Sequence, residues 1–286
     1  MNEPRIQSFF DPETFTATHL VWCGATRHAA VIDSVRDYDP RSGRTATASA
    51  ERVLDCVREH GLQVQWHLET HAHADHLSAA PWLKERLGGR IAIGAHIRQV
   101  QGVFRQVFNA PWIPTDGSPF DVLLEDGQEI ALGELRLRVM HTPGHTPACV
   151  TYVVGSHAFV GDTLFMPDYG SARCDFPGGD ARTLFRSIRR VLALPPDTRL
   201  HLCHDYLPGG RAAVWETTVA EQRARNIHVH DGVSEDEFVA MRTARDRTLS
   251  MPVLILPAVQ VNVCAGQLPP AEDNGTRYLK IPVDAL

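Results

Sequence analysis

The spacing of hydrophobic positions divides the first 108 residues into strands and helices that alternate along the chain. Alternating or continuous apolar residues predict strands over 15–22, 29–33, 62–69 and 90–95. Apolar residues at helical spacing predict helices over 47–60, 78–88 and 97–108. An alternation of strands and helices is typical of a layered α/β domain, in which helices cover the faces of a sheet.

The second part of the chain has a different pattern of short, closely spaced apolar segments. These predict an antiparallel meander over 122–124, 128–132, 135–140, 149–154 and 158–160. We expect a strand over 200–203 and helices over 180–194, 214–225 and 234–249, the last beginning at the capping box Ser234-Glu235-Asp236-Glu237. The apolar tail 253–263 has a β-like composition, and the proline-rich loop 110–120 is a candidate lid. We predict one domain over 1–286, with a C-terminal extension from about residue 210 and a sheet with helices outside in each half.

Composition narrows the class of protein without identifying its chemistry. Hydrophobic content of 43% and charged content of 22% are ordinary for a globular protein, and the net charge of −6 argues against a nucleic-acid partner. No apolar run approaches a membrane span, and residues 1–5 lack the pattern of a signal peptide, so we expect a cytoplasmic protein. The six cysteines are widely spaced without a C-x-x-C pair, which predicts reduced, packed thiols.

Candidate chemistry is densest in the segment Thr70-His71-Ala72-His73-Ala74-Asp75-His76-Leu77, directly after a predicted strand. Histidine and aspartate are costly to bury unless each has a partner, and a metal ion is a partner that all of them can share. His71, His73 and Asp75 are therefore expected to converge where the strand runs into a loop. The alternative is a polar surface turn.

Three further candidate ligands occur at the ends of later predicted strands. His145 follows the Pro143-Gly144 turn, Asp162 follows the apolar strand that ends at Gly161, and His204 follows the strand over 200–203. Each alone is more often an ordinary loop residue. Together they place potential ligands at successive strand ends of one sheet, which predicts a single metal site.

These motifs carry a resemblance to a known family. H-x-H-x-D-H at 71–76, P-G-H-T at 143–146, G-D-T-L-F at 161–165 and H-D-Y at 204–206 resemble the metallo-β-lactamase superfamily in their order. The resemblance implies an αββα sandwich of two mixed sheets with helices outside and the metal site at one edge. The family pattern assigns His71, His73 and His145 to one metal, Asp75, His76 and His204 to a second, and Asp162 to a position between them.

The same seven residues are compatible with two reactions. Two zinc ions would activate water in a thioester or lactam hydrolase, whereas one iron(II) held by two histidines and a carboxylate would leave positions for sulfur and dioxygen. The flanking P-G-H-T-P-A-C-V, Arg173-Cys174-Asp175-Phe176 and C-H-D-Y segments are similar to the persulfide dioxygenase branch. That branch implies one iron(II) per chain on His71, His145 and Asp162, with His73, Asp75, His76 and His204 orienting ligands and water.

The branch also implies a reaction and its substrates. Glutathione persulfide, or a related low-molecular-weight persulfide, would react with dioxygen to give sulfite and the thiol. Arg173 and Tyr206 match positions that hold a glutathione carboxylate and steer the persulfide, and Tyr206 and His204 are the candidate catalytic residues. Neither nucleic acid nor a membrane is implied, and a homodimer is an open alternative.

Several alternatives accompany this hypothesis. Arg173 could pair with Asp175 or Asp168, and Tyr206 could simply pack. Cys174 and Cys203 could exchange persulfide sulfur or be small buried hydrophobic residues. A dinuclear zinc thioester hydrolase of the glyoxalase II type is the second hypothesis for the function, although no basic cluster is obvious near the C-terminus. A non-enzymatic binding module is the third.

Overall fold

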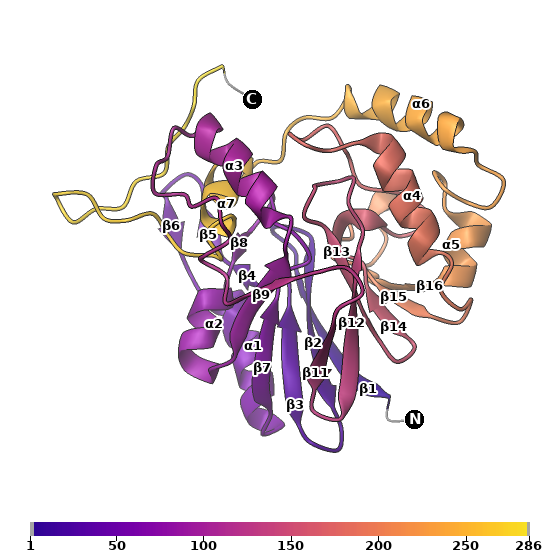
Figure 1. Cartoon of the computed structure of the whole chain (residues 1–286), viewed down its shortest axis with the longest axis horizontal. Helices are drawn as coiled ribbons and strands as arrows, with labels where there is room; N and C mark the ends of the chain where they lie inside the picture. The colour runs from indigo at the N-terminus through magenta and orange to yellow at the C-terminus, as the bar shows by residue number, and fades with distance from the viewer. Residues whose placement is uncertain (1–2, 285–286) are drawn as a thin grey trace.

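Two six-stranded sheets form the centre of the molecule in a computed structural model that describes residues 3–284 (Figure 1). The first sheet has the order β1-β2-β3-β7-β9-β10, and the second runs β11-β12-β13-β14-β15-β16. The strands of the first sheet are β1 (Pro4–Asp11), β2 (Thr16–Cys23), β3 (His28–Ile32), β7 (Gln63–Leu68), β9 (Arg90–Gly94) and β10 (Val122–Leu124). Those of the second are β11 (Glu129–Leu132), β12 (Leu135–His141), β13 (Val150–Val154), β14 (His157–Phe159), β15 (Arg199–His201) and β16 (Glu216–Thr218).

Both sheets are mixed. The first contains parallel pairs between β3, β7, β9 and β10, and the second contains the parallel pair of β14 and β15. Two small antiparallel pairs flank them, namely β4 (Val35–Arg36) with β8 (Leu77–Ser78) and β5 (Tyr38–Asp39) with β6 (Arg44–Thr45). Two short 3-10 helices lie at Gly161–Thr163 and Pro208–Gly210. Within residues 3–284, no helix is both long enough and apolar enough to cross a bilayer.

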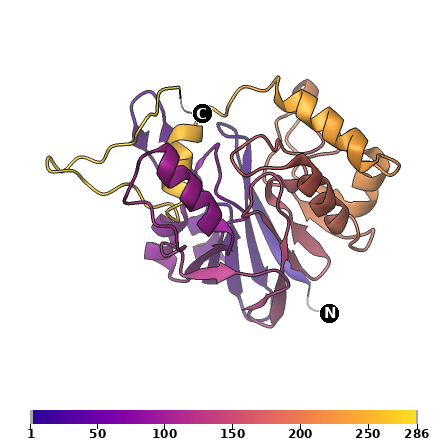
Figure 2. The ribbon, with the colours of Figure 1, turned by 45° about the horizontal axis from the view of Figure 1, so that its top comes forward.

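Seven helices lie outside the sheets in the described chain. They are α1 (Ala48–Glu59), α2 (Ala80–Leu87), α3 (Ile97–Val107), α4 (Ala181–Val191), α5 (Val219–Arg225), α6 (Glu235–Asp246) and α7 (Ile255–Asn262). Figure 2 shows α4, α5 and α6 together beside the second sheet, while α3 and α7 lie together on the other half of the molecule.

Three apolar layers follow from this arrangement. Between the sheets, side chains such as Ile32 and Leu68 meet Val139 and Tyr152. The outer face of the first sheet packs on α1 and α2, and the outer face of the second packs on α4, α5 and α6. Because β2 is covered on both faces, all eight of its residues are buried. The helix, sheet, sheet, helix order confirms the predicted αββα class.

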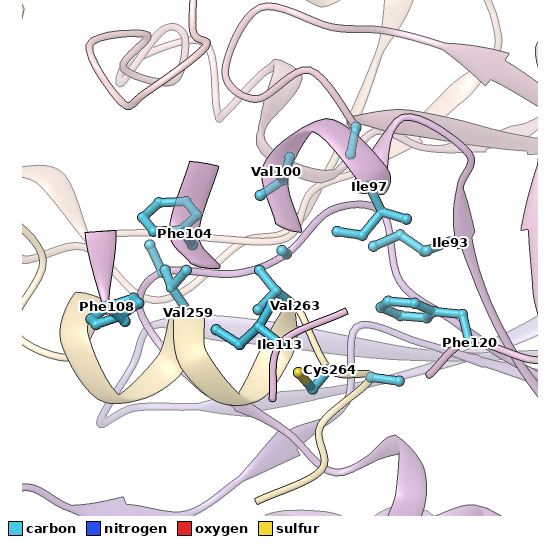
Figure 3. Close-up of a cluster of buried hydrophobic side chains, with 14 of the residues drawn as sticks. Ile93, Ile97, Val100, Phe104, Phe108, Ile113, Phe120, Val259, Val263 and Cys264 are labelled. Atoms are coloured by element: carbon cyan, nitrogen blue, oxygen red, sulfur yellow. The ribbon is translucent and has the colours of Figure 1, made fainter. Parts of the chain in front are cut away.

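A fourth apolar cluster joins α3 to α7, as Figure 3 shows. Val259 and Val263 of the C-terminal segment pack here with Phe104 and Phe108 of the α3 segment. Ala110, Ile113 and Phe120 of the loop 110–120 are buried in the same cluster. The interpretation of this loop as a lid is therefore wrong, because it is anchored in the core and none of its residues lines the cavity of the candidate site.

The strand β1 was not predicted, and three predictions over 122–263 differ from the structure. The apolar tail 253–263 forms the helix α7 instead of a strand, since a continuous apolar run does not distinguish a buried strand from a buried helix. The helix predicted over 214–225 begins only at residue 219, because Glu216–Thr218 pairs with β15 as an edge strand. The strand 122–124 lies parallel to β9 in the first sheet and outside the meander.

Candidate metal centre

All seven predicted ligand residues come together where four strands end. The segment 71–76 follows β7, and His145 follows β12. Asp162 lies in the short helix after β14, and His204 lies three residues after His201, the last residue of β15. Six of the seven are buried, while Asp75 is half-buried and reaches the cavity.

The ligand atoms form two adjacent groups. His71, His145 and Asp162 make one trio, in which Asp162 Oδ2 lies 3.9 Å from His71 Nε2 and 3.8 Å from His145 Nε2. The second group consists of His73, Asp75, His76 and His204. Asp162 connects them, since its Oδ1 lies 3.4 Å from His204 Nε2. His73 thus differs from the family pattern named above, because its ligand atom is grouped with the second set.

Each histidine has one ring nitrogen held by the protein. Nδ1 of His71 contacts the Thr70 hydroxyl at 3.0 Å, Nδ1 of His145 donates to the Arg173 carbonyl at 2.7 Å, and Nε2 of His73 donates to Asp33 at 2.9 Å. Nδ1 of both His76 and His204 contacts the Thr16 hydroxyl, at 3.3 and 3.4 Å. Such bonds fix the ring orientation and the tautomer of a metal-binding histidine.

Four of the opposite nitrogens are buried and have no hydrogen-bond partner within residues 3–284. These are His71 Nε2, His73 Nδ1, His76 Nε2 and His204 Nε2, and Asp162 Oδ1 shares this property. A buried polar atom without a partner is costly, so a convergence of five requires a ligand that accepts all of them. The donor set of imidazoles and carboxylates fits a transition-metal ion such as iron or zinc.

Asp33 is the central supporting residue of the centre, and the sequence analysis did not assign it to the site. Its carboxylate accepts hydrogen bonds from His73, from the Thr70 hydroxyl at 2.8 Å and from the Thr70 amide at 2.7 Å. Thr70 links Asp33 to His71. The sequence offers one signal, because Asp33 ends an apolar strand in the way that Asp162 does. Its positive φ of 53° is visible only in the structure.

Ionisation of the histidines follows from burial and from this carboxylate. Burial holds the pKa of His71 well below its ordinary value, and the His73 imidazole lowers it further, so the lone pair of His71 is free to bind a cation. Burial opposes a charge on His73 as well, but the Asp33 carboxylate raises its pKa well above the ordinary value.

Two glycines permit the close approach of the ligand loops. A Cβ at Gly161 would lie 2.5 Å from the Thr70 hydroxyl, and the φ of this residue is +51°. A Cβ at Gly144 would lie 2.3 Å from the Cα of Leu184, at a φ of +136°. The glycines of the G-D and P-G-H motifs are thus required by backbone conformation and by space.

A cavity of about 490 Å³ opens onto the centre. Asp75, His145 and Asp162 line its floor, and aromatic side chains including Phe165, Tyr169, Phe176 and Tyr206 form much of its wall. Tyr206 stacks on His204 with ring centroids 5.6 Å apart. Burial raises the pKa of the Tyr206 phenol well above its ordinary value, and Asp162 raises it further, so the hydroxyl stays protonated.

The arginines of the cavity differ in their partners. Arg173 lines it but donates two 2.7 Å hydrogen bonds to Asp175 and one to the Ser250 carbonyl, so its guanidinium is largely engaged. Asp168, the other partner considered, pairs with Arg211. Arg245 also lines the cavity, its guanidinium carbon lies 5.9 Å from the centroid of the Tyr169 ring, and within residues 3–284 it has no carboxylate partner. The sequence analysis missed Arg245.

The two cysteines near the centre are buried and uncharged. Burial raises the pKa of both thiols, and Cys174 lies beside the Asp246 carboxylate, with Sγ 3.3 Å from Oδ2. The sulfur of Cys203 lies near the ligand atoms of Asp162 and His204. Neither residue lines the cavity, which favours packing over sulfur exchange.

Comparison with known proteins agrees with this geometry. The model of the "Metallo-beta-lactamase superfamily" matches residues 13–204, which contain all seven candidate ligands. The chain belongs to the metallo-β-lactamase superfamily. Its relatives include a Burkholderia pseudomallei protein named "Probable metallo-hydrolase", 61% identical over 98% of this chain and 99% of the relative. "Glyoxylase B2" of Dictyostelium discoideum is 46% identical over 100% of this chain and 99% of the relative.

The relatives of the chain also include persulfide dioxygenases of the same superfamily. The human protein named "Persulfide dioxygenase ETHE1, mitochondrial" is 31% identical over 93% of this chain and 91% of its own length. The crystal structure of ETHE1 from Myxococcus xanthus matches with a TM-score of 0.73 at 31% identity, covering 92% of this chain and 100% of that one. Three proteins named "Beta-lactamase hydrolase-like protein", 52% to 53% identical, are longer, and the chain spans 65% of each. The predicted family and fold are thus confirmed, and the chain is a metal-binding enzyme of this superfamily.

Proposed function

We propose that the protein is an iron-dependent persulfide dioxygenase that oxidises glutathione persulfide, or a related low-molecular-weight persulfide, in sulfide detoxification. The observation that carries the proposal is the trio of His71, His145 and Asp162. Two histidines and one carboxylate on one side of an open cavity are the ligand set of non-haem iron(II) oxygenases. The likeness to persulfide dioxygenases supports the same assignment.

The overall reaction balances with dioxygen as the only oxidant. A persulfide, one dioxygen and one water give the thiol and sulfurous acid, which ionises to sulfite. The outer sulfur loses four electrons and dioxygen gains them. Iron(II) held by His71, His145 and Asp162 would supply open coordination positions and the redox chemistry that this exchange requires.

We assign two roles to the other polar residues of the centre, namely to orient the ligands and water and to donate a hydrogen bond to the substrate. His73, Asp75, His76 and His204 form the second group, and we assign them the positioning of ligands and water beside the trio. The protonated hydroxyl of Tyr206 at the cavity wall is suited to donate a hydrogen bond to the substrate, with His204 stacked behind it.

Glutathione carries two carboxylates, and three arginines line the cavity, of which Arg242 is buried and paired with Asp246. Arg173, the residue implied by the resemblance, is already paired with Asp175, so its donors are largely occupied. Arg245 has no carboxylate partner within residues 3–284. We therefore assign the main contact with a substrate carboxylate to Arg245 and a minor one to Arg173.

A dinuclear zinc thioester hydrolase of the glyoxalase II type is the second candidate. The complete second group of His73, Asp75, His76 and His204 favours it, because these residues offer enough donors for a second ion. The names of two relatives, a metallo-hydrolase and a glyoxylase, support it as well.

Oxygen uptake separates the two candidates. Protein loaded anaerobically with iron(II) should consume one dioxygen per sulfite formed when it receives glutathione persulfide. In the same assay Arg245→Gln should raise KM with kcat retained, whereas Arg247→Gln, an exposed arginine outside the cavity, should change neither. Cleavage of S-lactoylglutathione by the zinc-loaded protein, without oxygen uptake from the persulfide, would reject the dioxygenase and favour the hydrolase.

A further inference from the structure

Asn262, at the end of α7, forms three hydrogen bonds with the loop that carries the metal ligands. Its Nδ2 donates to the carbonyls of His73 at 2.8 Å and His76 at 2.7 Å, and its Oδ1 accepts from the Ser78 amide at 2.9 Å. The side chain is 4% exposed. Asn262 lies 58 residues beyond the last residue matched by the family model, which ends at 204.

The ligand loop depends on these bonds because it has little backbone support of its own. The segment between β7 and β8 is neither helix nor strand, and four of the candidate ligands lie in it. Within residues 3–284, no second protein donor reaches the carbonyl of His73 or of His76. Without Asn262, both would be buried carbonyls that lack a partner, and the loop would have to move to satisfy them.

The helix α7 also has anchors outside the ligand loop. Val259 and Val263 pack into the apolar cluster with α3, as Figure 3 shows, and the Val263 carbonyl accepts a 2.8 Å hydrogen bond from Gln101. Ala258 and Val261 pack against Leu77, the first residue after the H-x-H-x-D-H motif. The asparagine therefore projects from a fixed support and sets the position of the loop.

We infer that Asn262 is a positioning residue of the metal centre, which holds the His73 and His76 backbones so that their imidazoles face the ion. This inference rests on the metal centre of the proposed function but not on the reaction catalysed there. The centre is then built from the superfamily domain and a C-terminal helix together. A chain that ends at residue 204 would contain every ligand but would lack the residue that aligns two of them.

Gln260 provides a matched control on the same helix. It is a fully buried amide whose Nε2 donates to the Leu256 and Lys280 carbonyls at 2.7 and 2.8 Å. Its Oε1 accepts from the Lys280 amide at 2.9 Å, so it makes the same pattern of bonds as Asn262. None of its partners belongs to the ligand loop.

The experiment compares Asn262→Asp with Gln260→Glu in the full chain. In each change a carboxylate replaces a side-chain amide. The oxygen that accepts a hydrogen bond is kept, but the NH2 group that donates to two carbonyls becomes an oxygen that repels them. Metal affinity is measured by competition with a chelator, and the visible spectrum of the Co(II)-substituted protein reports ligand geometry. Asn262→Asp should bind Co(II) about 10-fold to 100-fold more weakly, as for other residues that orient ligands, with a changed spectrum. Gln260→Glu should leave both unchanged.

Two outcomes would overturn the inference. The first is wild-type affinity and spectrum in Asn262→Asp, and the second is an equal loss of affinity in Gln260→Glu, which would show a general effect of loosening α7. If Asn262→Asp does not fold, Asn262→Ala decides by the same two measurements. Neither measurement involves turnover, so a protein that fails to oxidise persulfides would disprove the proposed function and leave this result valid.

Discussion

The described chain brings buried histidines together at two places that differ in their fitness to bind a metal. The first is the candidate metal centre. The second consists of His19 on β2, His157 on β14 and His201 on β15, with His157 and His201 stacked at 5.2 Å. Both clusters are buried and rich in imidazoles, the first in loops at strand ends and the second on the strands themselves. They differ in where the ring nitrogens point.

In the second cluster the nitrogens bond to one another and to neighbours. His19 bonds to the Ser8 hydroxyl at 2.8 Å and to the Leu202 carbonyl at 3.0 Å, and His157 Nδ1 bonds to His201 Nε2 at 2.9 Å. Within residues 3–284, His201 Nδ1 is the one buried nitrogen of this cluster without a hydrogen bond, and Glu216 lies 3.8 Å from it. In the described part of the metal centre, five ligand atoms without a hydrogen bond converge. Histidine density therefore suggests a metal site, but convergent unpaired donors identify one.

The largest effect should come from removing the shared carboxylate of the centre. Asp162→Ala should abolish iron binding and with it oxygen uptake, because Asp162 contacts both ligand groups. Metal analysis after anaerobic loading gives the result directly. A variant that retains the wild-type iron content would show that the trio is not the binding site.

A smaller effect is expected from Asp75→Ala in the second group. If that group only orients ligands and water, the variant should keep about one metal per chain and lose activity by about 10-fold to 100-fold. Metal content and oxygen uptake are measured on the same samples. Two equivalents in the wild type that fall to one in Asp75→Ala would instead establish the dinuclear centre.

A substitution in the second histidine cluster should have the smallest effect on metal content. His201→Phe should keep the wild-type metal content, because His201 is no ligand, but it should change the pH dependence of stability. Burial lowers the pKa of His201 from 6.5 to about 2. Below pH 6.5 the unfolded chain therefore binds a proton that the folded chain does not, so folding loses stability as the pH falls toward 2.

Denaturation of the metal-free protein measures this change. Below pH 6.5, His201 should lower the free energy of unfolding of the wild type by about 1.4 kcal/mol per pH unit. The variant lacks this loss, so its free energy of unfolding relative to the wild type should rise by that amount per unit between pH 6 and pH 4. Parallel stability curves for the two proteins would contradict the assignment of a neutral His201. A fall in metal content would contradict the distinction between the two clusters.

The main strands and helices over 15–108 and the candidate ligands were predicted from local sequence, whereas the strand β1 was not. Strands such as 63–68 carry a clear hydrophobic pattern, and the helix over 235–246 begins at the predicted capping box of Ser234 and Glu237. The ligands could be found because each ligand motif lies within a few consecutive residues at the end of a strand, so no long-range contact is needed to recognise it.

The residues that were missed act across long distances in the chain. Asp33 reaches His73 and Asn262 reaches His76 only after the sheets and helices have packed. The pairing of Arg173 with Asp175 was one of two alternatives in the sequence, and only the folded chain shows that it forms and that Arg245 lines the same cavity. The helix α7 was missed because its mostly apolar sequence, in which Gln260 and Asn262 alternate with valines, resembles a strand locally.

The residues of the metal centre come from distant parts of the sequence, and this has a consequence for the protein in the cell. Its donors and supports extend from Thr16 to Asn262, so the unfolded polypeptide keeps only the local ligands of 71–76, and the ion should bind the native state much more tightly. Any such ligand stabilises by mass action. We expect chains made during metal scarcity to be degraded first, so that the abundance of the enzyme would follow the supply of its ion without any dedicated sensor.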